Sequence, residues 1–347
     1  MNLAKKITAV FLIIAMIFCF AACGADETDA ELDIGTINIG FIATGDVEDD
    51  AFSALHYNLF KNAYDLAGAG DGQVTIEENV AAGDTKAMKT AIDDLVARGC
   101  RLVVGIDPSY CDEFTKYAEE NSSIFFAVLG DYEEGTSVNN NLAILNISNF
   151  ESEYLEGITA GLSTESGKIA YVSDKTFGTE QTADINAFAE GAKSVKADAK
   201  VFLISTDDVK SGVDKAIEKK CDVIYSRNYV ADEETGETFF SVPESAANAM
   251  TLNKITKDGS EFISAAALNA DFLYTKIVLN TVNETFGDLS KFTWGIKDGV
   301  VDVSPAADAK VKAAVDAAKD KFMNGKNAVG TDAAKLAEKL DSSITVL

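Results

Sequence analysis

The sequence is poor in the residue types on which most catalytic sites depend. Its 347 residues include a single histidine, His56, and a single tryptophan. His56 is close to the apolar stripe of a predicted helix, where a packed role is favoured over proton transfer. No Ser-His-Asp set, HExxH motif, P-loop or GxGxxG fingerprint is present. Acidic residues number 56, so chance carboxylate pairs are inevitable and do not indicate a glycosidase; we expect no enzymatic activity and no cofactor.

Proline is also scarce, with 3 residues, and the 25 glycines are an ordinary share of the chain, which excludes collagen-like and low-complexity chains. Hydrophobic residues make up 47% of the chain, enough to bury the cores of two domains. Cys100, Cys111 and Cys221 lie beyond the N-terminal region and show no metal-site spacing. Cys100 and Cys221 begin apolar runs, so we expect buried thiols there, with a disulfide that includes Cys111 as the alternative.

Basic residues are fewer than acidic ones: the chain has 30 lysines and arginines and 56 aspartates and glutamates, which give a formal net charge of −26. Without Lys5 and Lys6, whose removal we expect, the charge becomes −28 because 28 basic residues remain. The negative electrostatic potential of such a chain repels nucleic acid and anionic lipid headgroups. We therefore expect no nucleic-acid partner.

The first 23 residues have the pattern of a targeting segment. Lys5 and Lys6 precede an apolar stretch over 7–20, which is too short for an ordinary membrane span, and Ala-Ala-Cys23 follows. The end of this segment resembles a bacterial lipobox, with Phe20 where leucine is usual. We expect 1–23 to be a signal peptide, Cys23 to be diacylated, and the acidic stretch 24–34 to be a tether on the extracytoplasmic face of the cell membrane. A plain secretory signal is the alternative.

Apolar runs alternate with amphipathic stretches along most of the chain. They predict strands over 37–43, 74–80, 101–106, 124–129 and 142–147, with helices over 50–66 and 86–97. A second cycle follows, with helices over 151–161, 183–194 and 212–220 and strands over 168–173, 201–205 and 222–226. The alternation indicates an α/β fold with parallel sheets covered on both faces.

The pattern is less regular after residue 229. A strand over 238–242 is followed by an irregular stretch that continues to residue 260. Strands over 263–267, 291–296 and 300–303 and helices over 271–286 and 306–323 come next, with a last strand near residue 344. This late alternation suggests that the chain passes between two lobes more than once.

Motifs from about Asn38 to Val329 resemble the basic membrane protein family, the nucleoside-receptor lipoproteins of ABC transporters. The strongest match is Glu151-x-x-Tyr154-Leu155-x-Gly157 followed by TESGKIAY over 164–171. Supporting matches are Phe188-x-x-Gly191, CDVI over 221–224 and GIKDGV over 295–300.

The resemblance implies a type I periplasmic-binding-protein fold, with two Rossmann-like lobes joined by three crossovers and a small polar solute between them. We expect 35–146 and 263–290 to form lobe 1, and 147–262 and 291–347 to form lobe 2. An ABC permease and an ATPase are the implied partners of a monomer. The alternatives are a sensory or adaptor lipoprotein, a receptor for a sugar or another non-nucleoside ligand, and an anchored hydrolase.

In open α/β sheets ligands lie beyond the carboxyl ends of strands. The first such loop offers Asp49, Asp50, Phe52 and Ser53, where the family has D-x-S-F-N, so the resemblance implies ligand contacts here. Helix capping by Asp49 or Asp50 and core packing of Phe52 are the alternatives.

Further candidates follow later strands. Asp107 caps a helix or binds ligand, and Tyr110 is a candidate stacking ring by resemblance. Asp131 matches a family strand that ends in aspartate, and Phe177 is a candidate from lobe 2.

The sequence departs from the family over 226–245, where the family has a strand ending in G-V-D that supplies a carboxylate to the ribose hydroxyls. Arg227, Asn228 or Glu244 are the candidate substitutes. An arginine there suits an anionic or carbonyl-bearing solute, so the nucleoside identity of the ligand stays open.

Overall fold

The structure is a computed structural model. It describes residues 37–68, 71–130, 139–174, 179–206, 208–227, 240, 242–243, 249–283, 285–289, 291–304 and 307–347. The predicted signal peptide, Cys23 and the tether lie outside these residues. The site candidates Asp131, Phe177, Asn228 and Glu244 lie outside them too.

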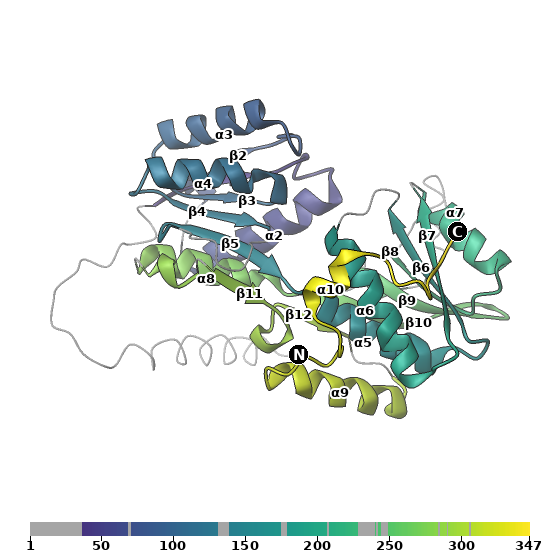
Figure 1. The fold of residues 1–347 in the computed structure, drawn as a ribbon. Helices are drawn as coiled ribbons and strands as arrows, with labels where there is room; N and C mark the ends of the chain where they lie inside the picture. The colour runs from purple at the N-terminus through teal and green to yellow at the C-terminus, as the bar shows by residue number, and fades with distance from the viewer. Residues whose placement is uncertain are drawn as a thin grey trace, which may run out of the picture. The chain divides into compact units, whose positions relative to one another are not determined.

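The first sheet has six strands in the order β11-β5-β4-β3-β1-β2 (Figure 1). All neighbouring strands in it are parallel, as the apolar runs predict. Its strands are β1 (Asn38–Ile42), β2 (Val74–Glu77), β3 (Cys100–Gly105), β4 (Phe125–Leu129), β5 (Leu142–Ile147) and β11 (Lys291–Trp294).

Helices cover both faces of the first sheet. They are α2 (Ala51–Leu66), α3 (Thr85–Ala97), α4 (Cys111–Glu120) and α8 (Ala270–Val282), with short 3-10 turns η2 (Asp71–Gln73), η3 (Pro108–Tyr110) and η5 (Phe286–Leu289). α3 and α4 pack on one face through a cluster that includes Leu95 and Phe114. α2 packs against α8 on the other face, where Phe60 meets Tyr274 edge-on.

The second sheet has seven strands in the order β12-β10-β9-β8-β6-β7-β13. Its strands are β6 (Lys168–Asp174), β7 (Lys200–Thr206), β8 (Val223–Arg227), β9 (Met250–Thr256), β10 (Gly259–Leu268), β12 (Val301–Val303) and β13 (Thr345–Val346). β6, β7, β8 and β13 form a parallel part, whereas β9, β10 and β12 pair antiparallel. The sheet is therefore mixed rather than parallel throughout.

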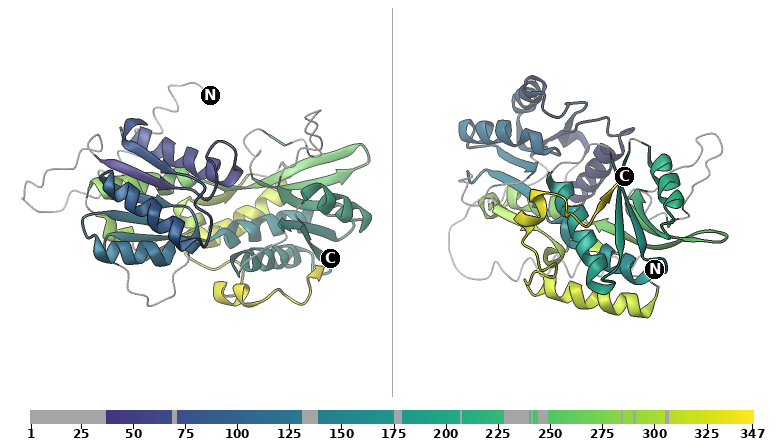
Figure 2. Two further views of the ribbon diagram at one scale, coloured as in Figure 1. Left: turned by 90° about the horizontal axis from the view of Figure 1, so that it is seen from above. Right: turned by 45° about the vertical axis from the view of Figure 1, so that its right-hand side comes forward.

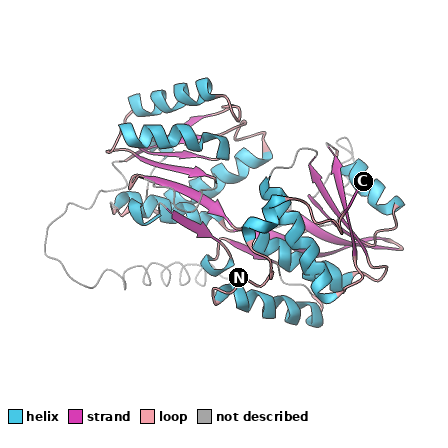
Figure 3. Ribbon diagram, viewed as in Figure 1, coloured by secondary structure: helices cyan, strands magenta, loops and turns pink. Residues whose placement is uncertain are grey.

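The second sheet also has helices on both faces. Figure 3 shows helices in cyan and strands in magenta. The helices of this sheet are α5 (Asn149–Ser163), α6 (Thr179–Val195), α7 (Val209–Glu218), α9 (Ala309–Met323) and α10 (Ala333–Glu338). α5 and α6 lie side by side in both views of Figure 2. Their contact depends on glycine, because a Cβ on Gly157 would lie 2.1 Å from the Phe188 carbonyl oxygen. A Cβ on Gly191 would likewise lie 2.1 Å from the Tyr154 carbonyl oxygen.

Three connections join the two sheets. β5 leads into α5 through Ser148, β10 leads into α8 through Asn269, and β11 leads to β12 through Gly295 and the turn η6 (Ile296–Asp298). Hydrogen bonds tie these connections to the strands beside them: the Ser148 amide donates to the Trp294 carbonyl at 2.8 Å, and the Asn269 amide donates to the Val300 carbonyl at 2.7 Å. The fold is thus the predicted α/β architecture of two Rossmann-like lobes with three crossovers.

Two boundaries of the predicted lobes are wrong. Residues 263–268 lie in β10, which pairs with β9 and β12 and belongs to lobe 2 rather than lobe 1. Residues 291–294 form β11, which pairs with β5 and belongs to lobe 1 rather than lobe 2. The described residues of 37–147 and 270–294 therefore make up lobe 1, and those of 149–268 and 296–347 make up lobe 2. A short apolar run does not reveal which of two sheets it will join, because strands of both sheets have the same pattern.

The three cysteines beyond the N-terminal region are free. Cys100 and Cys221 are buried, which confirms their predicted packing, and Cys111 is partly buried. Burial is the main cause that raises the pKa of both the Cys100 and the Cys221 thiol to about 11. These thiols are therefore protonated packing groups at neutral pH.

Candidate ligand-binding pocket

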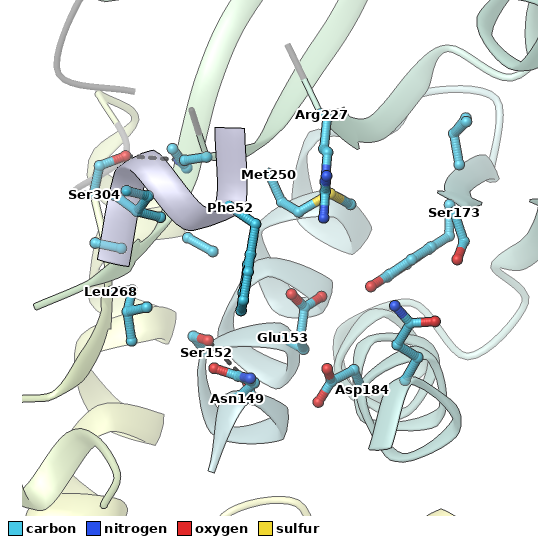
Figure 4. A pocket seen from close by; sticks show the side chains of 18 of the residues that line it. Phe52, Asn149, Ser152, Glu153, Ser173, Asp184, Arg227, Met250, Leu268 and Ser304 are labelled. Atoms are coloured by element: carbon cyan, nitrogen blue, oxygen red, sulfur yellow. Dashed lines mark hydrogen bonds between the residues drawn. The ribbon is translucent and has the colours of Figure 1, made fainter. Parts of the chain in front are cut away.

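The described residues enclose a pocket of about 690 Å³ (Figure 4). Side chains from α2, α5, α6 and the strands β6, β8, β9 and β10 line it. Ser173 and Arg227 come from the carboxyl ends of β6 and β8, and Phe52 and Asn149 come from the first turns of α2 and α5. Carboxyl ends of strands and helix N-termini are where α/β proteins bind ligands.

The polar part of the lining includes two carboxyl groups. Glu153 projects from α5 and Asp184 from α6, and Figure 4 shows them facing the same space. Glu153 is buried, with 5% of its surface exposed. The Tyr225 hydroxyl donates to Glu153 Oε1 at 2.8 Å. Within the described part of the chain, Glu153 Oε2 has no hydrogen-bond partner.

Glu153 is in a setting that disfavours its charged form. Burial is the largest cause, followed by the negative charge of Asp184, and together they raise the pKa of the Glu153 carboxyl well above its usual range. Hydrogen bonding by Tyr225 and Tyr171 counteracts this shift in part. Burial and the neighbouring Asp184 thus both oppose ionisation of this carboxyl group.

The apolar part of the lining includes the ring of Phe52. This ring is 41% exposed although it belongs to a helix that packs on a sheet, and Figure 4 shows it reaching into the pocket toward Glu153. Its inner side rests on the His56 ring, with centroids 4.5 Å apart. His56 Nδ1 lies 2.8 Å from the Tyr274 hydroxyl, and burial lowers the pKa of His56 to about 4. Phe52 is thus a supported aromatic surface with one open side.

The other polar lining groups include Asn149, Ser152, Ser173, Gln181 and Arg227. Arg227 is exposed and ends β8, and its positive charge acts on Tyr171. The pocket therefore offers hydrogen-bond acceptors, hydrogen-bond donors and the aromatic ring of Phe52 to one small molecule.

The structure brings two of the predicted site residues, Phe52 and Arg227, to this pocket. Asp50 instead caps α2, because its side chain accepts from the Ser53 amide at 2.8 Å. Ser53 is buried, and its hydroxyl accepts from the Gly45 amide at 3.0 Å. Asp49 is exposed beside this loop and is not among the lining residues. Asp50 and Ser53 thus shape the loop from which Phe52 projects.

The second predicted loop has a structural role in lobe 1. Asp107 caps η3 by accepting from the Ser109 amide at 2.9 Å, which is the alternative assigned to it from the sequence. Tyr110 is 1% exposed, donates a hydrogen bond to the Val80 carbonyl and stacks on Phe114. A ring with both faces packed in the core has no surface for a ligand, so the structure corrects the expectation that Tyr110 stacks on one.

Sequence reasoning missed Glu153 and Asp184. A signal was present for Glu153, because α5 is buried from residue 152 to residue 161 and carries two buried glutamates, Glu153 and Glu156, in that stretch. An acidic residue on a helix that is buried all round requires a functional or a hydrogen-bonding reason. Asp184 lies on the ordinary polar side of a predicted helix and gave no such signal.

Replacing Glu156 with glutamine should flatten the pH dependence of stability. Glu156 is fully buried and accepts a hydrogen bond from the Ser264 hydroxyl, and burial raises its pKa to about 8. The folded state then binds more protons than the unfolded state between about pH 4.5 and 8, so the stability from this group is present at low pH and lost as the pH rises. One such group gives a slope of about 1.4 kcal/mol per pH unit.

Urea unfolding of the wild type and Glu156→Gln across this pH range measures the two slopes. The variant should become the more stable protein at the alkaline end, because it buries no ionisable group at this position. Parallel stability curves would show that Glu156 titrates alike in the folded and unfolded states and would contradict the prediction.

The described residues contain no cluster of three or more histidine, cysteine or acidic side chains that could hold a metal ion. In the same residues, no helix is long and apolar enough to cross a membrane.

Two Rossmann-like lobes, three connections and a pocket at the carboxyl ends of strands define a type I periplasmic binding protein. The chain belongs to the ABC transporter substrate-binding protein family described as PnrA-like, whose model matches residues 36–330. The resemblance found from its motifs is thereby confirmed. Members of this class bind small molecules outside the cytoplasm and work with a permease and an ATPase.

The chain is also similar to individual known proteins. The chain is 22% identical over 313 residues to a purine-binding protein of Brucella abortus (strain 2308), covering 85% of this chain and 81% of that protein. An ABC transporter solute-binding protein from Conexibacter woesei DSM 14684 superposes with a TM-score of 0.63 and 18% identity, covering 84% and 97% of the two chains. A transcriptional activator of the comK gene from Bacillus halodurans superposes with a TM-score of 0.57 and 16% sequence identity. The match covers 82% of this chain and 97% of that chain. Structural likeness at these identities supports the fold alone.

Proposed function

We propose that this protein captures a nucleoside in the pocket and delivers it to an ABC permease. The observation that carries the proposal is the exposed Phe52 ring facing the carboxyl groups of Glu153 and Asp184 across one cavity. An aromatic surface stacks on a base, and carboxylates accept hydrogen bonds from sugar hydroxyls. A nucleoside presents both features at opposite ends of one rigid molecule.

The size of the pocket and the comparisons support this ligand class. About 690 Å³ is within the roughly 300–1,000 Å³ of typical small-molecule sites. The Brucella abortus relative is a purine-binding protein by name. Glu153 and Asp184 supply acidic groups from α5 and α6, in place of the carboxylate of the family's G-V-D strand end, which this sequence lacks.

Location and assembly follow from the proposed role. We propose that the chain is anchored through a diacylated Cys23, with the acidic stretch 24–34 as a tether that holds a monomer outside the membrane. Solute capture requires no chemical step, so the proposal includes no enzymatic activity.

Thermal unfolding of the purified protein with nucleosides, free bases, ribose and nucleoside monophosphates tests the proposal. A ligand present at about 100 times its Kd stabilises the folded state by about 2.7 kcal/mol, which gives a clear rise in Tm. We expect this rise with at least one purine nucleoside and a smaller one with its base or with ribose alone. A rise with sugars and none with any nucleoside would contradict the nucleoside assignment.

A further inference from the structure

The third connection, from β11 to β12, passes from one lobe to the other within a single residue. The Trp294 carbonyl is held by lobe 1, because it accepts from the Ser148 amide at 2.8 Å and continues the ladder between β5 and β11. The Gly295 carbonyl is held by the turn η6, since it accepts from the amides of Asp298 and Val300, both at 3.2 Å. Peptide bonds are planar, so only the φ and ψ torsions of Gly295 can turn one held carbonyl relative to the other.

A carboxyl group from α5 fixes the lobe 2 side of this step. Glu151 is in the first turn of α5, and its Oε2 accepts from the Ile296 amide at 2.7 Å. The same carboxyl group lies against Gly295, where a Cβ would be 2.6 Å from Oε2 and 2.9 Å from the carboxyl carbon. The torsions of Gly295, φ −138° and ψ −157°, are extended and open to any residue. Glycine is therefore required here for space, so that Glu151 can reach the Ile296 amide.

The other two connections are hydrogen-bonded to the third. Ser148 and Asn269 precede α5 and α8, and neither side chain caps its helix. The Asn269 backbone amide donates to the Val300 carbonyl at 2.7 Å, and its side-chain amide donates to the Gly299 carbonyl at 3.0 Å. Together with the bond from Ser148 to Trp294, these contacts make the third connection the segment on which the other two depend.

We infer that Glu151 is a positioning residue for lobe closure: it fixes the third connection to lobe 2, so that this connection turns at Gly295. The inference goes beyond the proposed function, and only its test with adenosine rests on that function. Periplasmic binding proteins close on their ligands by rotation at a few connecting residues. Without the bond from Glu151, the segment after Gly295 gains conformational freedom in the open protein. That freedom is lost again when the lobes close on a solute, so the affinity for the solute falls.

The positions of these residues separate an effect on the hinge from an effect on the pocket lining. Asn149 and Asn269, from the first two connections, line the pocket, whereas Glu151 and Gly295 are not among its lining residues. A substitution of Glu151 or Gly295 therefore removes no lining side chain. A change in affinity then reports on the hinge.

Calorimetric titration with adenosine tests this coupling, at a temperature at which urea unfolding shows every variant to be folded. Glu151→Ala should bind about tenfold more weakly than the wild type, the cost of ordering about one more residue of backbone. Gly295→Ala should lose a similar amount, because its Cβ must displace the Glu151 carboxyl group, which is the far end of a flexible side chain. The double variant should lose no more than either single variant, since no carboxyl group is left to displace.

Two further variants serve as controls. Glu151→Gln keeps an acceptor for the Ile296 amide and should bind adenosine nearly as well as the wild type. Gly72→Ala should not change the affinity, because nothing lies within 4 Å of a Cβ at Gly72.

Hydrogen exchange of the solute-free proteins measures the bond itself. The Ile296 amide should exchange slowly in the wild type and in Glu151→Gln, and much faster in Glu151→Ala and Gly295→Ala. Equal exchange rates in the wild type and Glu151→Ala would overturn the inference, as would wild-type affinity for adenosine in Glu151→Ala or additive losses in the double variant. A wild type that does not bind adenosine would count against the proposed function, and the exchange rates alone would then decide on the inference.

Discussion

Replacing Gly157 with alanine should lower the free energy of unfolding by about 3 kcal/mol, the upper part of the range for overpacking. The new Cβ would lie 2.1 Å from the carbonyl oxygen of Phe188 and 2.8 Å from its carbonyl carbon. Both are backbone atoms of α6, so no side-chain rotation relieves the overlap, and α5 and α6 must separate. This cost exceeds the gain of about 1 kcal/mol that alanine brings to a helix interior.

Urea unfolding measures this effect, and Gly72→Ala is the control because nothing lies within 4 Å of a Cβ at Gly72. Gly191→Ala should be similarly destabilising, since its Cβ would lie 2.1 Å from the Tyr154 carbonyl oxygen. The two losses should not add, because one separation of the helices relieves both overlaps. A Gly157→Ala protein as stable as the wild type would show that α5 and α6 are further apart than the structure places them.

Replacing Phe52 with alanine should weaken nucleoside binding by about tenfold to a hundredfold. Base–aromatic stacking contributes about 1–3 kcal/mol by alanine substitution, and the Phe52 ring is 41% exposed and available for it. Because that exposure limits its part in the core, the variant should retain most of its stability.

Calorimetry with adenosine and with ribose separates stacking from a general effect on the pocket. Affinity for adenosine should fall in Phe52→Ala, and affinity for ribose should change little. Phe52→Tyr is the matched variant, because it keeps the aromatic face and should bind adenosine about as well as the wild type. Equal losses for adenosine and ribose would show that Phe52 shapes the pocket and does not stack on the base.

The fold could be predicted where local pattern and tertiary contact agree. Apolar runs such as 37–43 and 142–147 are buried on both faces of a parallel sheet, and they form β1 and β5 almost as predicted. Helix starts were also visible, since Asp50 and Asp107 both cap the turns that follow them. In each case the determining interaction lies within a few residues of the chain.

The rest depends on partners that are distant in sequence. β9 was not predicted because Thr251 and Asn253 are polar. Both are nevertheless buried, and the side-chain amide of Asn253 donates a hydrogen bond to the Thr251 hydroxyl at 2.9 Å. Tyr110 follows a strand as a ligand-binding ring would, but Val80 and Phe114 enclose it. Glu153 becomes a site residue only because Tyr225 and Asp184 converge on it.

The interleaved strand order also decides when the protein can fold during its synthesis. β5 acquires its neighbour β11 only after residues 291–294 have been translated, and α8 at 270–282 must emerge to pack on α2. All seven strands of the second sheet and their helices are encoded between β5 and the end of the chain, and β13, the last of them, forms one edge of that sheet. A ribosome that has completed residue 268 therefore carries a first sheet with an open edge. Neither lobe can finish as an independent nascent domain, and most of the chain must be released before both are complete.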